Sequence, residues 1–158
     1  MKSDLLCKIE AMTEADIYSA VYKDHLTGAL NRRAFDECAA AADYVVLADL
    51  DSLKYINDTA GHRAGDAYIK ELHDVLAFAF GDDNVYRLGG DEFAVLPQCP
   101  LEGTLSLMER LQEQFRFFSF GAGEDLPCAD NQLSADKLLR GGLGLRAPRG
   151  ERPTWWSE

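Results

Sequence analysis

The sequence is organised around Tyr86-Arg87-Leu88-Gly89-Gly90-Asp91-Glu92-Phe93-Ala94-Val95-Leu96. Two apolar, β-prone runs flank a pair of glycines, and glycine reaches positive φ without a clash from a Cβ atom. The composition therefore predicts a hairpin with a tight primed turn at the glycine pair. Asp91 and Glu92 follow directly, and adjacent carboxylates favour either open water or a bound cation. The hairpin is either an ordinary exposed turn with a polar tip or one side of a ligand site.

A second acidic pair ends the run Tyr44-Val45-Val46-Leu47-Ala48-Asp49-Leu50-Asp51. A continuous apolar run predicts a strand buried on both faces in the middle of a sheet. Asp49 and Asp51 occupy alternate positions, so they point to the same face of that strand. Beside the hairpin they would bring three or four carboxylates to one sheet edge, a set that suits Mg²⁺ with substrate phosphates completing its shell. The alternative is that these acids only cap the next helix.

The segment after this strand carries an amide and a carboxylate that suit guanine. Its pattern predicts a helical turn at Leu53–Asp58, a glycine-punctuated loop at Gly61–Asp66 and an amphipathic helix at Ala67–Phe80. Asn57 can bond the O6 or N3 side of guanine, and Asp66 can accept from its N1–H and N2 amino groups. Taken singly, each residue is better explained as a helix cap.

The remaining elements follow from periodicity and capping signals. Helices are predicted at Ser3–Tyr22, Arg32–Ala42 with Asn31 as N-cap, Leu101–Phe115 and Leu133–Arg140, a strand at Phe117–Phe120, a loop from Gly123 to Asn131, and an irregular tail from Gly141. Asp24 and Arg32 or Arg33 either form only a surface ion pair at a solvated helix start or take part in chemistry, and the local pattern favours neither reading.

Composition excludes several classes of protein. The chain has 158 residues, enough for one domain with a sizeable core, and its net charge of −11 argues against a nucleic-acid surface. No apolar stretch is long enough to span a bilayer, and no signal-peptide core follows Met1. The four cysteines are widely spaced without a Cys-x-x-Cys pair, so neither a zinc site nor a disulfide framework is indicated. We therefore expect a cytoplasmic protein.

Three motifs in order resemble the GGDEF family of diguanylate cyclases. They are Asp-x-Leu-Thr-Gly-x-Leu-Asn-Arg-Arg-x-Phe (24–35), Asp-Leu-Asp-x-x-Lys-x-x-Asn-Asp-x-x-Gly-His-x-x-Gly-Asp (49–66) and Arg-x-Gly-Gly-Asp-Glu-Phe (87–93). The resemblance implies a palm-like α/β (α+β) sandwich, with a mostly antiparallel central sheet flanked by helices and the hairpin at the active site. The implied organisation is an N-terminal helix or arm at 1–22, a GGDEF domain at 23–145 that diverges after about residue 97, and an irregular tail at 146–158.

The resemblance also implies a reaction and the residues that perform it. Two GTP molecules would be joined into cyclic di-GMP with release of pyrophosphate, and a homodimer would be required because each domain binds one GTP. Asp49, the Leu50 carbonyl and Glu92 would hold Mg²⁺, with Mn²⁺ as an alternative, and Asp91 would assist a second metal or take the 3′-hydroxyl proton. Lys54 and the amides of Ser52 and Leu53 would contact the phosphates, Asn57 and Asp66 would read guanine, and His62 would lie by the nucleotide.

The chain departs from the family pattern in two places. Phe80-Gly81-Asp82-Asp83 stands where many members carry the inhibitory Arg-x-x-Asp product site, so feedback inhibition there is predicted to be absent. After the signature hairpin one strand pair is missing, and Leu143 replaces the family's phosphate-binding Lys, for which Arg140, Arg146 or Arg149 could substitute. A second reading is therefore a degenerate domain that binds GTP or cyclic di-GMP without efficient catalysis. A third, a polymerase acting on ATP, is disfavoured by Asp66.

Overall fold

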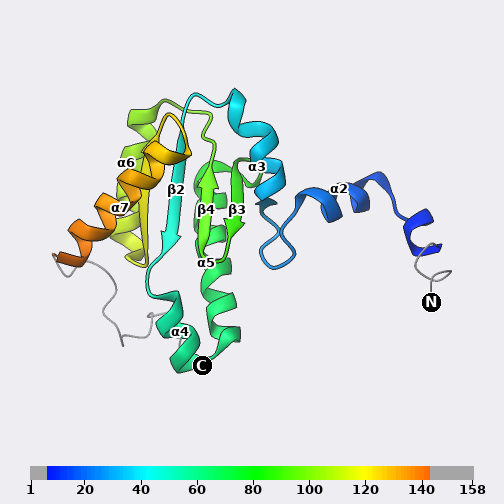
Figure 1. The fold of residues 1–158 in the computed structure, drawn as a ribbon, viewed down its shortest axis with the longest axis horizontal. Coiled ribbons are helices and arrows are strands. Elements are labelled where there is room, and N and C mark those ends of the chain that lie inside the picture. The colour runs from blue at the N-terminus through cyan, green and yellow to red at the C-terminus, as the bar shows by residue number, and fades with distance from the viewer. Residues whose placement is uncertain (1–6, 143–158) are drawn as a thin grey trace.

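The computed structural model describes residues 7–142, which form a five-stranded sheet covered by helices on both faces (Figure 1). The strands lie in the order β1-β3-β4-β2-β5, in which β1 and β3 are parallel and every other neighbouring pair is antiparallel. The predicted mostly antiparallel α+β sheet is therefore confirmed. The strand bounds are β1 Leu30–Asn31, β2 Val45–Leu50, β3 Val85–Gly89, β4 Glu92–Val95 and β5 Phe118–Gly123.

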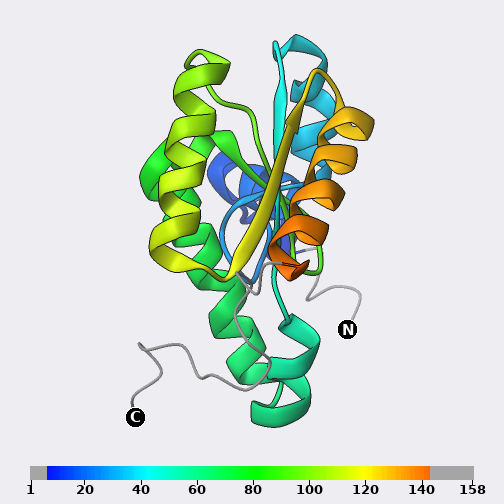
Figure 2. The same ribbon diagram turned by 90° about the vertical axis from the view of Figure 1, so that its left-hand side faces the viewer.

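Two hydrophobic layers follow from the alternation of side chains along β2. Val46, Ala48 and Leu50 pack in one core cluster with buried residues of α5 and α6, whereas Val45 and Leu47 pack in the other with residues of α3 and α7. Figure 2 shows α6 and α7 on opposite sides of β5. The helix bounds are α2 Glu14–Tyr22, α3 Arg32–Cys38, η1 Ala39–Ala41, α4 Leu53–Ala60, α5 His62–Phe80, η2 Asp82–Asn84, α6 Leu101–Phe115 and α7 Leu126–Gly142.

The predicted N-terminal helix at Ser3–Tyr22 is wrong in its described part. Residues 7–10 are helical, but the chain turns at 11–12 and α2 begins afresh after Thr13. Thr13 forms a capping box with Asp16, and these reciprocal side-chain bonds favour a new helix start over a continuous helix. Residues 3–6 lie outside the described residues. α2 has no buried residue and projects from the body of the domain (Figure 1).

The helix predicted at Arg32–Ala42 begins where expected, at Arg32, but its α-helical part ends earlier, at Cys38. Asn31 caps it as expected, because its side chain accepts a hydrogen bond from the Ala34 amide at 3.1 Å. After Cys38 the α-helix tightens into the short 3₁₀ turn η1. The helix predicted at Leu101–Phe115 is confirmed with the same bounds as α6.

The predicted loop at Gly61–Asp66 is wrong, since α5 begins at His62 and only Gly61 separates it from α4. Gly61 adopts φ +86°, a value that lets the chain turn sharply between two helices without a Cβ clash. Asp66 therefore lies inside a helix rather than at the end of a loop. Neither Asn57 nor Asp66 caps a helix, because the caps are Ser52 and Gly61.

The predicted loop from Gly123 to Asn131 is also wrong. Strand β5 extends through Gly123, and α7 begins at Leu126 rather than Leu133. A Cβ atom on Gly121 would collide with the Leu133 amide and the Ala129 carbonyl, so the bare strand backbone lets α7 pack directly on it. Glycines that resemble loop residues in the sequence are here the contact surface for a helix.

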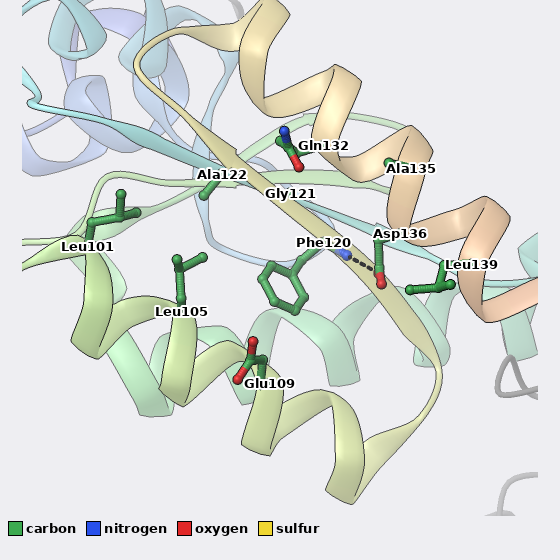
Figure 3. A pocket seen from close by; sticks show the side chains of 10 residues that line it. All are labelled: Leu101, Leu105, Glu109, Phe120, Gly121, Ala122, Gln132, Ala135, Asp136 and Leu139. Atoms are coloured by element: carbon green, nitrogen blue, oxygen red, sulfur yellow. Dashed lines mark hydrogen bonds between the residues drawn. The ribbon is translucent and has the colours of Figure 1, made fainter.

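Strand β5 forms one edge of the sheet, and a pocket of about 430 Å³ opens over it. Figure 3 shows residues of α6 on one side of this pocket and residues of α7 on the other, with β5 between them. Asp136 of α7 accepts a hydrogen bond from the Phe120 amide at 3.1 Å at the pocket floor. Among the helices of the described residues, none combines the length and hydrophobicity that crossing a bilayer requires.

Candidate active site

Asp49 and Glu92 are directly opposite each other in the antiparallel ladder between β2 and β4. Residues opposite each other in such a ladder carry their side chains on the same face, about 4.5–5.5 Å apart at Cβ. Asp49 shares its face with Val45 and Leu47, which is the face covered by α7. The fold therefore brings together the two carboxylates for which a shared cation was predicted.

The hairpin turn lies beside this pair, one residue later than predicted. Gly89 pairs with Glu92, so Gly90 and Asp91 are the turn residues rather than the two glycines. Gly90 adopts φ +45°. The Leu50 amide donates to the Asp91 carbonyl at 3.2 Å, which ties the turn to the end of β2.

Arg87 holds the other side of the turn. Its Nε and Nη2 donate to the Gly90 carbonyl at 3.1 and 2.7 Å, and its Nη1 donates to Asp24 Oδ1 at 2.9 Å. The predicted partners of Asp24 are therefore wrong: Arg32 pairs with Asp36 in the exposed i,i+4 position instead. Burial raises the pKa of Asp24, but its hydrogen bonds from Arg87 and Thr27 outweigh burial and hold that pKa below the usual value.

Helix α7 places two cations against Asp49 of β2 and against Asp51, which follows the strand. Lys137 Nζ lies 2.6 Å from Asp49 Oδ1, and Arg140 Nη2 lies 3.8 Å from Asp51 Oδ2. Asp51 is fully buried and also accepts a hydrogen bond from Ser119 Oγ at 3.0 Å. Asp49 and Asp51 thus face the same side of the sheet, as strand alternation predicted.

Sequence reasoning missed Lys137, although a signal was present. A partly buried and a fully buried acid, two residues apart, favour nearby cations, and Lys137 and Arg140 stand three residues apart on the only helix that follows β5 in the described chain. Arg140, which was considered as a substitute phosphate ligand, is buried against Asp51 instead. Leu143, Arg146 and Arg149 lie outside the described residues.

Burial raises the pKa of Asp49 to about 6. The hydrogen bond from Lys137 lowers this pKa, whereas the negative charges of Asp91 and Asp51 raise it further. The carboxylates are therefore close enough to repel one another, which is the electrostatic condition under which a cation is stabilising.

The carboxylates of Asp49 and Glu92 fit a hard divalent cation whose remaining ligands come from substrate phosphates and water. Within residues 7–142, no three His, Cys, Asp or Glu side chains are grouped so that they could hold an ion by themselves. Mg²⁺ is commonly bound by one or two carboxylates together with substrate phosphates and water, and Asp49 with Glu92 supplies such a pair. The Lys137 ammonium on Asp49 occupies a position where positive charge is stabilised.

Helix α4 begins immediately after the acids. Ser52, its N-cap, adopts φ 64° and ψ 22°, a left-handed conformation that is uncommon for a residue other than glycine. The first amides of a helix have no partner within it, so those of Leu53 and Lys54 are available to an acceptor outside the helix. The side chain of Lys54 is exposed.

The predicted guanine-reading residues lie on the adjoining pair of helices. Asn57 is in α4, and its Oδ1 lies so close to Gly65 of α5 that a Cβ atom there would collide with it. Asp66 follows Gly65 and is exposed, and His62 is the exposed first residue of α5. Asn57, His62 and Asp66 thus lie on α4 and α5, whereas Asp49 and Glu92 lie on strands of the sheet.

Comparison with known proteins identifies the family of this arrangement. Residues 21–121 match the family described as diguanylate cyclase, GGDEF domain. Over 125 residues the chain is 37% identical to the diguanylate cyclase DgcM of Escherichia coli K12, a match that covers 68% of this chain and 30% of that protein. It is 38% identical over 102 residues to the probable diguanylate cyclase DgcI of the same organism, covering 60% and 23%. The chain thus spans less than a third of the length of these curated relatives.

Solved structures show the same fold. The diguanylate cyclase SiaD of Pseudomonas aeruginosa, solved in complex with its activator SiaC, superposes with a TM-score of 0.68 at 26% identity, covering 87% of this chain and 66% of that one. The GGDEF domain of DgcB from Caulobacter crescentus, solved in complex with c-di-GMP, superposes with a TM-score of 0.65 at 27% identity, covering 77% and 92%. Together with the acids at the signature hairpin, the match over residues 21–121 shows that this chain belongs to the GGDEF family of diguanylate cyclases.

Proposed function

We propose that this chain is a diguanylate cyclase domain that condenses two GTP molecules into cyclic di-GMP. The observation that carries the proposal is the cross-strand pair of Asp49 and Glu92 beside the Gly90–Asp91 turn. In each half of the reaction the 3′-hydroxyl of one GTP attacks the α-phosphate of the other. One phosphodiester bond forms, the bond to the β-phosphate breaks, and pyrophosphate leaves.

The acids at the end of β2 and in the hairpin would hold the metal and the reacting groups. Asp49, Glu92 and the Leu50 carbonyl would bind Mg²⁺ or Mn²⁺, and Asp91 would accept the 3′-hydroxyl proton or assist a second ion. Such ions lower the pKa of a bound hydroxyl and screen the charge that develops on the phosphate. Support comes from the hydrogen bonds from Arg87 to Gly90 and from Leu50 to Asp91, which hold the turn and would position Asp91 before substrate arrives.

The helices α4 and α5 would bind the nucleotide. The amides of Ser52 and Leu53 and the exposed Lys54 would contact the phosphates at the start of α4, where the helix dipole favours negative charge. Asn57 and Asp66 would bond the guanine edge, and His62 would lie beside the nucleotide. Support comes from Gly65, whose missing side chain lets Asn57 lie against α5 next to Asp66.

The reaction requires two copies of the domain. One site holds one GTP, and both phosphodiester bonds form only when two sites face each other. We therefore propose a homodimer as the catalytic form.

One observation favours a second candidate function. Asp49 is already paired with the Lys137 ammonium, so the domain could bind GTP or cyclic di-GMP with little metal chemistry. Such a domain would act as a binding or regulatory module rather than as an efficient enzyme.

One assay separates the two functions. The purified protein is incubated with GTP and Mg²⁺, and cyclic di-GMP is measured by mass spectrometry. A cyclase makes the product, and Asp49→Ala and Glu92→Ala each abolish it while circular dichroism shows that the fold is retained. GTP binding by calorimetry without product would support the binding module, and product formation unchanged in both variants would contradict the site.

A further inference from the structure

We infer that Lys137 is an internal cation that competes with the divalent metal for Asp49, so that metal binding requires the Lys137–Asp49 ion pair to open. The inference rests on the proposed metal site. Lys137 Nζ lies 2.6 Å from Asp49 Oδ1, and the two side chains are 30% and 17% exposed. An ion pair this far withdrawn from water is screened less than a pair on the open surface.

The competing contact is built into the packing of α7. Gly121 and Gly123 leave the backbone of β5 bare, and α7 lies directly on it. Asp136 holds the helix in place, because it accepts hydrogen bonds from the Phe120 amide at 3.1 Å and from Gln112 Nε2 at 2.8 Å. Lys137 is the next residue, so its stem starts from a fixed backbone position.

The neighbouring cation on the same helix behaves differently. Arg140 is 7% exposed and faces Asp51, which is itself fully buried and bonded by Ser119. The contact between Arg140 and Asp51 does not depend on the rotamer of Lys137, so it keeps α7 packed when Lys137 moves. Lys137 has a flexible four-carbon stem and a side chain that is partly exposed, so it can leave Asp49 by changing rotamer while the helix stays in place.

Simultaneous occupation of Asp49 by both cations is unfavourable. The ammonium takes one carboxylate oxygen, and a divalent ion on either oxygen lies only a few ångströms from that ammonium. The charges are alike, and the surrounding protein screens them less than water does. Removing the ammonium should therefore tighten metal binding.

The test measures Mn²⁺ binding alone, without nucleotide, from the electron paramagnetic resonance signal of the free ion at one fixed pH. Lys137→Met keeps the length of the stem and removes the charge. Losing one competing charge-assisted contact corresponds to roughly tenfold tighter Mn²⁺ binding. Lys137→Arg restores the charge and should bind like the parent. Lys70→Met, which removes an exposed charge on α5, controls for net charge and should leave affinity unchanged.

A second measurement uses the parent protein and needs no stable variant. Mg²⁺ is titrated while the Lys137 side-chain ¹³Cε signal is followed by NMR, with Lys70 as the reference. The Lys137 signal should shift as the metal binds, and the Lys70 signal should not.

The outcomes separate this inference from the proposed function. If Asp49→Asn abolishes Mn²⁺ binding but Lys137→Met binds no tighter than the parent, Lys137 only positions Asp49 and the inference is overturned. A Lys137 signal that stays in place at saturating Mg²⁺ overturns it too. If Asp49→Asn leaves Mn²⁺ binding unchanged, the metal site itself is wrong and the inference is lost with it.

Discussion

Gln112 Nε2 donates to Asp136 Oδ2 at 2.8 Å across the open edge of β5, and both side chains also bond the strand backbone. Gln112 donates to the Phe118 carbonyl at 3.2 Å, and Asp136 accepts from the Phe120 amide at 3.1 Å. In a strand, the carbonyl of one residue and the amide two residues later point to the same edge. The two side chains therefore bond backbone groups that a neighbouring strand would otherwise pair.

Gln112→Met should expose this edge. The change keeps the length of the side chain but removes the hydrogen bonds that Gln112 donates to the Phe118 carbonyl and to Asp136, at a cost of about 1–3 kcal/mol. An unprotected edge also favours pairing between chains. We expect a lower urea midpoint and concentration-dependent association by light scattering. Gln114→Met, an exposed glutamine on the same helix, should do neither; equal effects of the two changes would contradict the role of Gln112.

The Asp24–Arg87 pair should contribute to stability more than an exposed ion pair does. Its side chains are 15% and 12% exposed, and Arg87 also bonds the hairpin turn. Asp24→Asn should lower the free energy of unfolding by about 1–3 kcal/mol. Arg32→Met breaks a pair whose side chains are 53% and 60% exposed, and should cost less than about 1 kcal/mol. Urea unfolding measures both, and similar losses would refute the distinction.

Gly65→Ala should separate stability from nucleotide binding. Alanine is the better helix former by about 1 kcal/mol, but its Cβ would collide with Asn57 Oδ1 and displace that side chain. We expect little loss of stability together with weaker GTP binding by calorimetry. Gly103→Ala in α6 meets no atom within 4 Å and should raise stability without affecting GTP. GTP affinity that survives Gly65→Ala would remove Asn57 from the proposed site.

Asp66→Asn should weaken the choice of guanine over adenine. It exchanges one acceptor oxygen for a donor that would face the donors of guanine, a mismatch that costs about 1–3 kcal/mol. GTP affinity should fall by roughly ten- to a hundredfold while ATP affinity changes little. Asp58→Asn, an exposed acid on α4, is the matched control. Unaltered discrimination in the Asp66 variant would show that this exposed carboxylate does not read the base.

Protonation of Glu71 should make the domain more stable in mild acid than at neutral pH. Burial raises its pKa from the usual 4.5 to about 7, and the charge of Asp74 adds to the shift. Between these values the folded state binds more protons than the unfolded state, so stability rises as pH falls from about 7 towards 4.5. The melting temperature of Glu71→Gln should therefore rise less than that of the parent between pH 7.5 and 5.5. The same change at exposed Glu113 should leave the pH dependence of the parent intact, and identical profiles for Glu71→Gln and the parent would exclude Glu71.

Local patterns determined much of this protein. The apolar run ending at Asp49 predicted β2, the spacing within Leu101–Phe115 predicted α6, and the order of the three motifs predicted the family and the acids at the hairpin. These features depend on neighbours within a few residues or on side-chain periodicity, both of which the linear chain contains.

The tertiary structure decided the partners of those residues. From the sequence alone, Asp24 had only nearby arginines as ion-pair partners, Asp49 was assigned no cationic side chain, and Gly123 was read as the start of a loop. In the fold, Asp24 meets Arg87, Asp49 meets Lys137, and Gly121 accepts a helix against a strand. A carboxylate is neutralised by whichever cation the packing brings within reach, and a glycine serves as a turn or as a contact surface according to what lies against it. Neither is set by sequence distance: the packing of α7 on β5 decided the Lys137 contact and the role of the β5 glycines, and the position of β3 decided the Asp24–Arg87 pair.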